Sequence, residues 1–527
     1  MESSFIEAAC LRHTELPGTS RLFADFSYDF DRVARFYRHN PHDPNSLAQV
    51  AQEAARETNY PESRRAALVS ALKGQNGESD SLTRLAQPGT VAIVTGQQVG
   101  LFGGPLYTIY KALTVVRLAA DLTARGIPAV PIFWLASEDH DFPEVSYVYS
   151  FDAADHPVRL QIEPPPGSTG SRPVGNLPIE NPPLDELRHS LAGFPHGKEV
   201  AALVEAAYPP GVSMTQGFRA LLLKILPKAG LLTLDPLDPA IRAIAAPLLA
   251  EALSAAPELK ARLLERNREL TAAGYHTQVL VEPKTSLFFQ LKDGERTPLR
   301  RKDSEFAALR DHAEEISPNA LLRPVMQDYL LPTAGFIGGP GELAYLAQSS
   351  VIYDRLLGRM PVVLARSSFT ILDARAAKLL GRYKLTVPQT LVPEDALRER
   401  IAAVLVPPTL ETAFYETGRE FDKQLDRLNE ELERFDPTLA ASLTKSRGKI
   451  KWQHNKARMK AWREILRRDA RAQSDAHHLT SLLFPHRHLQ ERFYSILPFL
   501  AKHGLELVDQ LQESVTLSCP DHRVLTI

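Results

Sequence analysis

A glycine-rich loop between residues 95 and 104 is the stretch of this sequence best suited to binding an anion. It follows residues 90–94, a short β-branched run that predicts a buried parallel strand, and it precedes a helix. Such a loop presents backbone N–H groups and the positive end of a helix dipole to a phosphate or carboxylate. The candidate residues are Thr95, Gly96, Gln97, Gln98, Gly100, Gly103, Gly104 and Lys111. Their spacing matches neither the Walker A pattern nor the dinucleotide fingerprint, and a plain tight turn is the alternative.

Three carboxylates surround one histidine after the next predicted strand. These residues are Glu138, Asp139, His140 and Asp141. Carboxylates are costly to bury without a task, so this cluster is a candidate catalytic site. We expect His140 to act as a general base or acid, with Asp139 or Asp141 holding its tautomer. Binding of a divalent metal is a weaker alternative, and a solvated loop with an N-capping aspartate is the alternative without function.

Three later segments add binding groups. Arg323 is suited to bidentate binding of a carboxylate, although a structural salt bridge accounts for it equally well. Residues 338–342 repeat the earlier arrangement, in which glycines and a proline open a helix. Residues 365–368 follow another predicted strand and are suited to a mobile phosphate-binding loop. The candidate residues of these segments are Arg323, Gln327, Gly338, Gly339, Glu342, Arg366 and Ser367.

The elements that must position these groups form a parallel sheet. Apolar residues recur on one helical face between 106 and 120, and residues 129–135 predict a second buried strand. Strand, helix and strand over this length predict a βαβ unit with parallel strands. Residues 331–337 and 361–365 can return to the same sheet. The fold class is therefore α/β, with an open, doubly wound sheet.

Composition shifts and proline clusters divide the chain further. Residues 1–85 predict mostly helix, and an Asp-Gly pair at 293–294 predicts a hairpin. The expected order is N-terminal helices with the first half of the core (1–150), a first insertion (151–204), core (205–254), a second insertion with the hairpin (255–322), core completion (323–390), a helical arm (391–478) and a C-terminal return segment (479–527).

The arm has the pattern of a coiled coil. Apolar residues follow a 4,3 spacing, which is a heptad seam; they are Phe421, Leu425, Leu428, Leu432, Phe435 and Leu439. The first half of the arm is acidic and the second half, from residue 445, is basic. Opposite arms of a helical hairpin would pair these charges. We favour this pairing and dimerisation over the alternative, in which the basic half binds RNA.

Composition narrows the function classes. A formal charge of −2 lowers the expectation of nucleic-acid binding. The two cysteines, Cys10 and Cys519, stand near opposite ends of the chain, so the sequence predicts neither a disulfide framework nor a cysteine-based zinc site. The N-terminus has no pattern of a secretory signal, and no window approaches the roughly 20 apolar residues of a membrane span. We therefore expect a cytoplasmic protein without a membrane segment.

Three long motifs give the chain a resemblance to the BshC family, the cysteine ligases of bacillithiol biosynthesis. They are TGQQVGLFGGPLYTIYKALT (95–114), PIFWLASEDHDFPEV (131–145) and SPNALLRPVMQDYLLPTAGFIGGPGELAYLAQ (317–348). The resemblance covers essentially the whole chain. It implies a Rossmann-like core similar to class I synthetases and nucleotidylyl transferases, two insertions, and a coiled-coil arm that mediates a homodimer. The implied reaction joins L-cysteine to the amino group of glucosaminyl-malate.

The resemblance also implies cofactors and roles, with one departure. Cysteine would be activated by ATP, with Mg²⁺, through an adenylate; residues 96–104 would line the nucleotide site, and His140 would be the catalytic histidine. Class I enzymes that select cysteine often hold its thiol on zinc, and no such site is recognised here. The paired-histidine signature of class I is also missing, and Gln97 and Gln98 stand in the loop instead. The alternatives are another nucleotidylyl transferase on this fold and a non-catalytic coiled-coil scaffold.

Overall fold

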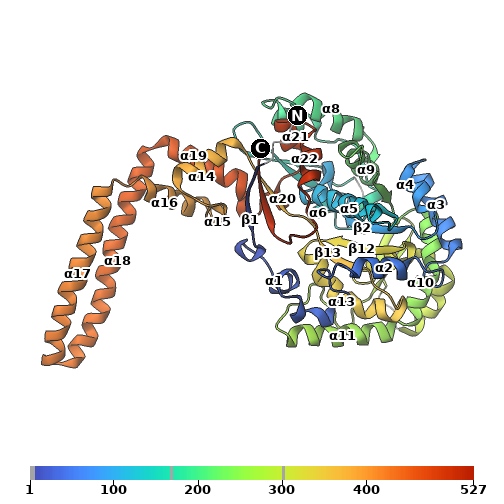
Figure 1. The fold of residues 1–527 in the computed structure, drawn as a ribbon, viewed down its shortest axis with the longest axis horizontal. Helices are drawn as coiled ribbons and strands as arrows, with labels where there is room; N and C mark the ends of the chain where they lie inside the picture. The colour runs from blue at the N-terminus through green and yellow to red at the C-terminus, as the bar shows by residue number, and fades with distance from the viewer. Residues whose placement is uncertain (1–5, 166–169, 300–302) are drawn as a thin grey trace. The chain divides into compact units, whose positions relative to one another are not determined.

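The computed structural model describes residues 6–165, 170–299 and 303–527, which form two compact units. Unit 1 comprises Met1–Thr370 and Glu491–Leu525, and unit 2 comprises Ile371–Gln490 and Thr526–Ile527 (Figure 1). The chain therefore leaves unit 1 after Thr370 and returns to it at Glu491.

The core of unit 1 is a parallel sheet of five strands in the order β13-β12-β2-β3-β8. Its strands are β2 (Val91–Gln97), β3 (Ala129–Leu135), β8 (Leu232–Leu234), β12 (Thr333–Gly338) and β13 (Val362–Ala365). β2 and β3 pair in parallel from Val91 opposite Ala129 to Gln97 opposite Leu135. The helix between them is α5 (Tyr107–Ala124). The predicted βαβ unit, the Rossmann-like fold class and the two returning strands are confirmed.

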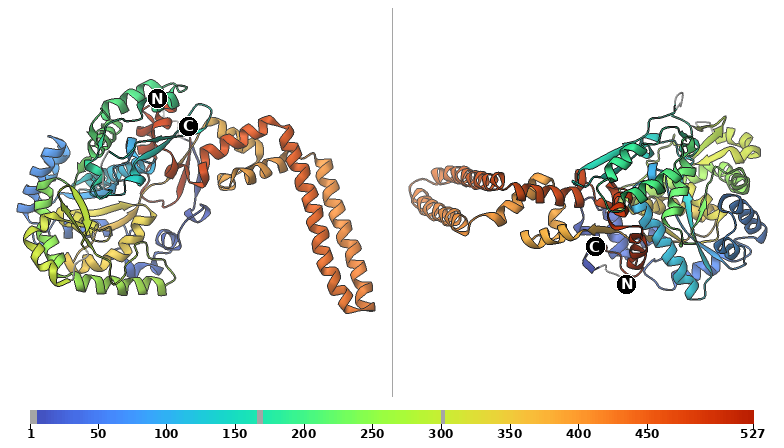
Figure 2. Two further views of the ribbon diagram at one scale, coloured as in Figure 1. Left: turned by 180° about the vertical axis from the view of Figure 1, so that it is seen from behind. Right: turned by 90° about the horizontal axis from the view of Figure 1, so that it is seen from above.

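Helices cover both faces of this sheet, which explains the continuous apolar runs of the strands. Ala92, Val94 and Trp134 face a core shared with α3 (Glu62–Asn76), α10 (Pro239–Ser254) and α13 (Pro340–Leu356). α5 packs against β2 and β3. Figures 1 and 2 show α5 on one side of the sheet and α2 (Ser46–Ala54) with α13 on the other.

The strand order reverses between β2 and β12. From β2 the chain continues outward to β3 and β8, whereas from β12 it continues to β13 at the opposite edge. In open α/β sheets, ligands bind at such a reversal, beyond the carboxyl ends of the strands. The topology therefore indicates a binding site formed by the loops after β2 and β12.

Smaller elements surround the core of unit 1. β9 (Phe288–Lys292) and β10 (Glu295–Pro298) form the predicted hairpin, and Asp293 and Gly294 both have positive φ at its turn. Short ladders join β4 (Tyr147–Phe151) to β5 (Pro157–Gln161), β6 (Pro178–Ile179) to β7 (Val212–Ser213), and β11 (Ile316–Pro318) to β9. The remaining helices are α1 (Arg21–Tyr28), α4 (Asp80–Leu85), α6 (Phe142–Val145), α7 (Leu184–Leu191), α8 (Gly197–Ala207), α9 (Met214–Ile225), α11 (Ala256–Ala272), α12 (Arg323–Leu330), α20 (Gln490–Phe493), α21 (Leu497–His503) and α22 (Leu507–Ser514).

A second sheet joins the two ends of the chain. Its order is β1-β15-β14, with β1 (Ile6–Leu11), β15 (His522–Thr526) and β14 (Phe369–Leu372). The N-terminal segment, for which helix is predicted, therefore begins with a strand. This sheet also brings Cys10 to Cys519, with 3.6 Å between the two Sγ atoms. Residues distant in sequence thus become neighbours through strand pairing.

Unit 2 is helical, and two long antiparallel helices form its arm. These are α17 (Pro408–Phe435) and α18 (Pro437–Arg468); shorter helices are α14 (Ala374–Tyr383), α15 (Val387–Thr390), α16 (Glu394–Leu405) and α19 (Ala470–Leu483). Arg447 of α18 lies 2.7 Å from Asp422 and 2.5 Å from Asp426 of α17, and Lys451 lies 2.8 Å from Asp422. The predicted pairing of the basic and acidic halves is confirmed at these residues.

No single helix among the described residues is long and apolar enough to cross a membrane. α10 and α11 reach that length and composition only as a pair, and they are bent by 75° at their junction.

Candidate active site

A cavity of about 600 Å³ lies beyond the carboxyl ends of the parallel strands in unit 1. The loops after β2, β3, β12 and β13 all reach it, so it occupies the reversal point of the sheet. The structure brings these predicted residues to its wall: Gly96, Gln97, Gln98, Lys111, Glu138, Asp139, His140, Arg323, Gly339, Glu342 and Arg366. Four sequence segments that were singled out separately therefore form one site.

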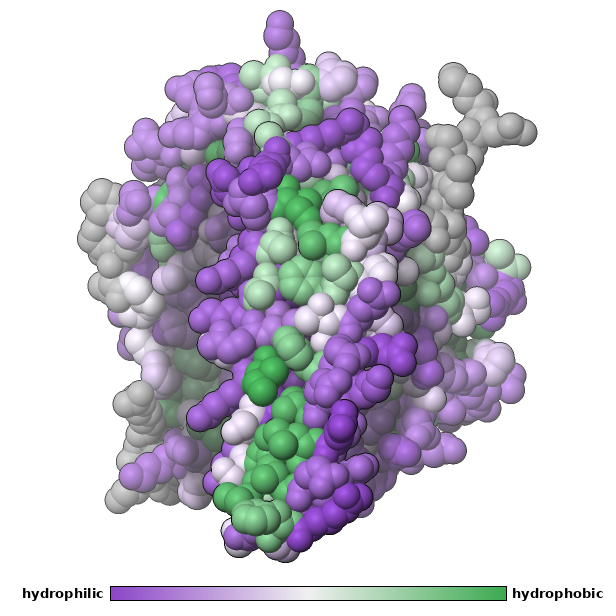
Figure 3. Space-filling view, turned by 90° about the vertical axis from the view of Figure 1, so that its left-hand side faces the viewer, coloured by the Kyte–Doolittle hydropathy of each residue, from purple (hydrophilic) through white to green (hydrophobic). Residues whose placement is uncertain are grey.

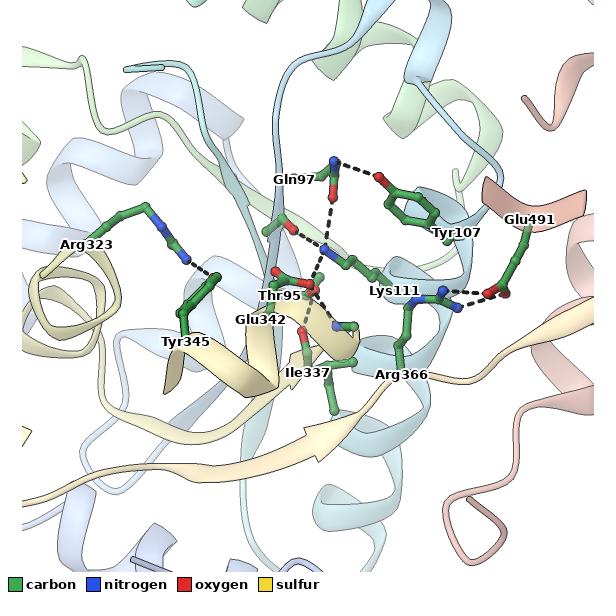
Figure 4. Close-up of polar contacts among 12 residues, drawn as sticks. Thr95, Gln97, Tyr107, Lys111, Arg323, Ile337, Glu342, Tyr345, Arg366 and Glu491 are labelled. Carbon is green, nitrogen blue, oxygen red and sulfur yellow. Dashed lines mark hydrogen bonds and ion pairs between the residues drawn. The ribbon is translucent and has the colours of Figure 1, made fainter. Parts of the chain in front are cut away.

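Lys111 lines the cavity and makes polar contacts with several neighbouring residues (Figure 4). Its side chain is almost fully buried, and its Nζ donates to the carbonyl oxygen of Gly96 and to Oε1 of Gln97, both at 2.9 Å. Glu342 completes the shell with an ion pair of 2.5 Å. Burial lowers the pKa of Lys111, and Glu342 acts in the opposite direction. Lys111 thus joins the end of β2 to the start of α13 and holds both at the cavity.

His140 receives a hydrogen bond from an arginine that lies far away in the sequence. The guanidinium of Arg296, in β10, donates to Nδ1 of His140 at 2.9 Å. A guanidinium has no acceptor atom, so Nδ1 must accept and the neutral ring carries its proton on Nε2. His140 can therefore offer Nε2–H as a donor, and its neutral form cannot accept a proton at Nδ1 while this bond is kept.

The carboxylates beside His140 have other partners than those predicted. Oδ1 of Asp139 accepts the backbone N–H of His140 at 2.7 Å and lies 3.8 Å from Nδ1 of the ring. Asp141 caps α6 by accepting the N–H of Glu144 at 3.3 Å. The prediction that Asp139 or Asp141 holds the histidine tautomer is therefore wrong, because Arg296 occupies Nδ1. The capping alternative is confirmed for Asp141.

Two other carboxylates converge on one amide. Nε2 of Gln98 donates to Oδ2 of Asp139 at 2.7 Å and to Oε2 of Glu144 at 2.9 Å. Carboxylate oxygens are hard ligands of the kind that Mg²⁺ prefers. The amide hydrogens of Gln98 occupy the place where a cation would reduce the repulsion between the two carboxylates. Glu138 differs, because it is buried and paired with Arg242 at 2.6 Å. Burial raises the pKa of Glu138, and Arg242 opposes this effect.

Arg323 and Arg296 face the cavity without an acidic partner. Arg323 donates to Oε1 of Gln327 at 3.1 Å and to the hydroxyl of Tyr345 at 2.8 Å. Arg296 donates to the hydroxyl of Ser317 and the carbonyl oxygen of Pro318, both at 2.9 Å, besides His140. In the described ranges, no carboxylate lies within 4.0 Å of either guanidinium. The salt-bridge alternative for Arg323 is not met, and both cations remain available to an anionic ligand.

Arg366 is held by a buried carboxylate. Its two terminal nitrogens lie 2.9 and 2.6 Å from the oxygens of Glu491, which also accepts from the hydroxyl of Ser368 at 3.0 Å. Burial alone would raise the pKa of Glu491, but Arg366 outweighs this effect and the pKa falls to about 2. Figure 4 shows Arg366 between Glu491 and the cavity residues. A bidentate, buried pair of this kind fixes the orientation of the guanidinium.

Several predicted residues lie outside the cavity. The backbone N–H groups of Gly100, Gly103 and Gly104 bond to carbonyl oxygens of their own loop, and Gly103 and Gly104 have positive φ. Thr95 joins β2 to β12 through a 2.8 Å bond to the carbonyl oxygen of Ile337. This part of the loop behaves as the tight turn of the alternative interpretation, and only residues 96–98 reach the cavity.

Two more predicted residues, Gln327 and Gly338, support the wall from behind, and a third, Ser367, lies at another cavity. Gln327 joins Arg323 to Asp328, which accepts from its amide at 3.0 Å. Gly338 has no room for a side chain, because a Cβ would come within 3.0 Å of Glu342 and Leu343. Ser367 faces a second, smaller cavity, and its N–H donates to the hydroxyl of Thr114 at 3.1 Å.

Several lining residues have no distinguishing pattern in the sequence, and Arg296 is the most important of them. Others are Tyr107, Gln278, Phe289, Asn319, Tyr345 and Arg492. Arg296 follows the hairpin turn, and nothing in its local pattern separates it from a solvated arginine. Its burial and its stacking at 3.7 Å over the ring of Phe289 depend on how the second insertion folds back.

Family comparisons cover nearly the whole chain. Residues 7–367 match the family described as "Bacillithiol biosynthesis BshC, N-terminal Rossmann-like domain". Residues 369–527 match the family described as "Bacillithiol biosynthesis BshC, C-terminal coiled-coil domain".

Similar curated proteins span the same length. A protein of Solibacter usitatus is 50% identical over 99% of this chain and 100% of its own length. A protein of Koribacter versatilis is 34% identical over 98% of this chain and 99% of its own length, and one of Salinibacter ruber is 32% identical over 96% of each. All three bear the name "Putative cysteine ligase BshC".

Proposed function

Because the chain belongs to the BshC family of bacillithiol biosynthesis, we propose that it is a ligase that joins L-cysteine to the amino group of glucosaminyl-malate. The observation that carries this proposal is the pair of guanidiniums, buried Arg296 and half-buried Arg323, that face the cavity with neutral hydrogen-bond partners only. A cation shielded from water without an ion-pair partner favours an anionic ligand, and the acceptor substrate supplies one.

The malate part of the acceptor has two carboxylates. A guanidinium binds a carboxylate through two parallel N–H donors, which fixes both its position and its orientation. Arg323 is the better placed of the two for this task, because Tyr345 and Gln327 hold its plane from behind. In the proposed complex, Arg323 binds a malate carboxylate and thereby places the sugar amino group inside the cavity.

The cysteine carboxyl group needs activation before an amine can attack it. In the proposed first step, its oxygen attacks the α-phosphorus of ATP, forming cysteinyl adenylate and releasing pyrophosphate. In the second step, the amino nitrogen of glucosaminyl-malate attacks the acyl carbon, the amide bond forms, AMP leaves and the nitrogen loses a proton. Both steps place growing negative charge on oxygen atoms, which fixed donors lining the cavity stabilise.

In the proposed reaction, each polar cluster of the site has its own role. His140 presents Nε2–H as a donor to phosphate oxygens, since Arg296 already occupies Nδ1. Asp139 and Glu144, which converge on Gln98, are the groups that would receive a proton from the attacking amine or hold Mg²⁺ that arrives with ATP. Lys111 is a positioning residue, because its three partners leave it no free donor.

In the proposed homodimer, the two copies associate through the arm. α17 has no buried residue, and its heptad seam remains open: Phe421 is 40% exposed, Leu428 46% and Phe435 81%. Figure 3 shows the resulting apolar stripe along the helical hairpin. A seam of this length favours association with an identical seam, because two copies would cover the apolar surface of both.

The test uses purified protein with cysteine, glucosaminyl-malate and Mg-ATP, each omitted in turn. Mass spectrometry should detect the amide product only in the complete mixture, together with equal amounts of AMP and pyrophosphate. A protein that binds both substrates but forms no amide under any of these conditions would contradict the proposal. Arg323→Met supplies the matched control, because it should keep the fold while the KM for glucosaminyl-malate rises by about ten- to a hundredfold.

A further inference from the structure

The only two cysteines of the sequence meet in the structure. They are separated by 509 positions, yet their Sγ atoms lie 3.6 Å apart. Cys10 is in β1, and Cys519 is in the loop just before β15. Because β1 pairs with β15, the sheet holds both thiols on neighbouring segments. The cluster lies outside the active-site cavity and has no part in the proposed reaction.

Asp521 adds a carboxylate to the two thiols. One ligand atom from each of Cys10, Cys519 and Asp521 lies within 4.8 Å of the other two. The carboxylate is oriented by the hydroxyl of Tyr28, which donates to Oδ1 at 2.8 Å. Tyr28 is held in turn by the backbone N–H of His13, at 2.7 Å, and by Arg12 stacked 4.2 Å over its ring. Hydrogen bonds of this kind orient the carboxylate ligands of metal sites.

The distance between the sulfurs separates two interpretations. A disulfide needs about 2.05 Å between them. Two thiolates on one tetrahedral zinc, each bonded at about 2.3 Å, stand about 3.8 Å apart. The observed 3.6 Å is close to the second value, and it is equally the distance of an S–H···S contact between two reduced thiols. A divalent cation would compensate the negative charge of two thiolates and one carboxylate.

We propose that Cys10, Cys519 and Asp521 form a binding site for a thiophilic divalent metal ion of the zinc type. The three side chains supply two sulfurs and one oxygen, and water completes the tetrahedral coordination. Each thiol loses a proton when the ion binds, so binding strengthens as pH rises. The ion joins the first strand of the chain to the last one.

A series of hydrogen bonds connects the proposed metal site to the active-site cavity through β15. His522 follows Asp521, and its ring bonds at Nδ1 to Ser368 (2.6 Å) and at Nε2 to Thr370 (2.8 Å). Ser368 in turn donates to Glu491, the partner of Arg366. We assign the ion a structural role, in which it fixes β15 and thereby supports the orientation of Arg366.

The test uses the full chain, freed of any histidine tag, reduced and stripped of metal. Titration with Co²⁺ should produce a thiolate-to-cobalt charge-transfer band that saturates at about one equivalent, as expected for a sulfur-bound ion, and Zn²⁺ should abolish it. Zn²⁺ should also raise the unfolding temperature of the wild type. Tyr28→Phe, which removes only the support of Asp521, should weaken Zn²⁺ binding by about ten- to a hundredfold.

The control variants separate this site from adventitious binding. Cys10→Ser and Cys519→Ser should each lose the charge-transfer band while their circular dichroism stays unchanged. The proposal is overturned if the reduced wild type binds no Zn²⁺, or if the double serine variant binds it as tightly as the wild type. Recovery of the chain as a disulfide that binds no zinc after reduction would overturn it as well. None of these outcomes depends on ligase activity, so failure here would leave the proposed reaction untouched.

Discussion

Arg296 donates a hydrogen bond to Nδ1 of His140, across 156 positions of sequence and 2.9 Å of space. This contact joins the hairpin of the second insertion to the loop that follows β3. It also determines which nitrogen of the imidazole carries the proton, and hence whether His140 donates or accepts in the cavity.

Arg296→Met should lower kcat by about ten- to a hundredfold, which corresponds to the loss of one hydrogen bond to a charged group. The reason is that the imidazole becomes free to rotate and to change tautomer. Arg296→Gln is the matched variant, because its amide can still donate to Nδ1, and it should retain more activity. Equal losses in both variants, with unchanged KM, would show that the donor to Nδ1 does not matter.

Arg323→Met should raise the KM for glucosaminyl-malate by about ten- to a hundredfold. The KM for cysteine should stay nearly constant, because the guanidinium is assigned to malate. The KM of Arg323→Lys for glucosaminyl-malate should lie between the values of the wild type and of Arg323→Met, because lysine keeps the charge but loses the two parallel donors. Steady-state kinetics with each substrate varied separately measure both KM values. A larger change in the KM for cysteine than in the KM for glucosaminyl-malate would contradict the assignment of Arg323 to malate.

Glu491→Gln should destabilise unit 1 by about 3–5 kcal/mol at pH 7, because it leaves Arg366 buried without a counterion. The pH dependence has a definite sign. The pKa of Glu491 is lowered to about 2 in the folded protein, so its stabilisation is complete above the unfolded pKa near 4.5 and is lost as pH falls toward 2. Urea unfolding should show that the difference in the free energy of unfolding between the wild type and the variant becomes smaller as the pH falls over that range. A difference that stays constant would mean that the ion pair is not its source.

Leu428→Glu should weaken self-association by at least about tenfold, because it places a charge in the seam. Arg427→Glu is the control, since it introduces the same residue next to the seam. Sedimentation at several concentrations should show a dimer for the wild type and the control, and a shift toward monomer for Leu428→Glu. A wild type that remains monomeric at all concentrations would refute the proposed role of the arm.

Regular backbone patterns account for what could be predicted from the sequence. The β-branched run before Thr95 and the apolar helix face after it predict β2, α5 and β3, and the structure has all three. The convergence of residues 96–98, 138–140 and 339–342 could also be anticipated, because the carboxyl ends of parallel strands meet at one edge of a sheet.

Contacts between distant segments account for what could not be predicted. Arg296 reaches His140 only because the hairpin folds over the sheet, and Cys10 reaches Cys519 only because the terminal strands pair. The glycines after residue 98 satisfy their amides within the loop, and no sequence pattern distinguishes that turn from an anion-binding one. Local periodicity specifies elements, whereas these relationships arise from packing.

The most direct test of the central claim follows oxygen from cysteine during the reaction. Cysteine labelled with ¹⁸O in its carboxyl group is incubated with glucosaminyl-malate, Mg-ATP and the protein, and the masses of the products are measured by mass spectrometry. Ligation through an adenylate predicts one labelled oxygen in AMP for each amide bond formed. Amide product with the label in inorganic phosphate, or with no label transferred at all, would contradict the adenylate route, and the absence of any amide would contradict the ligase itself.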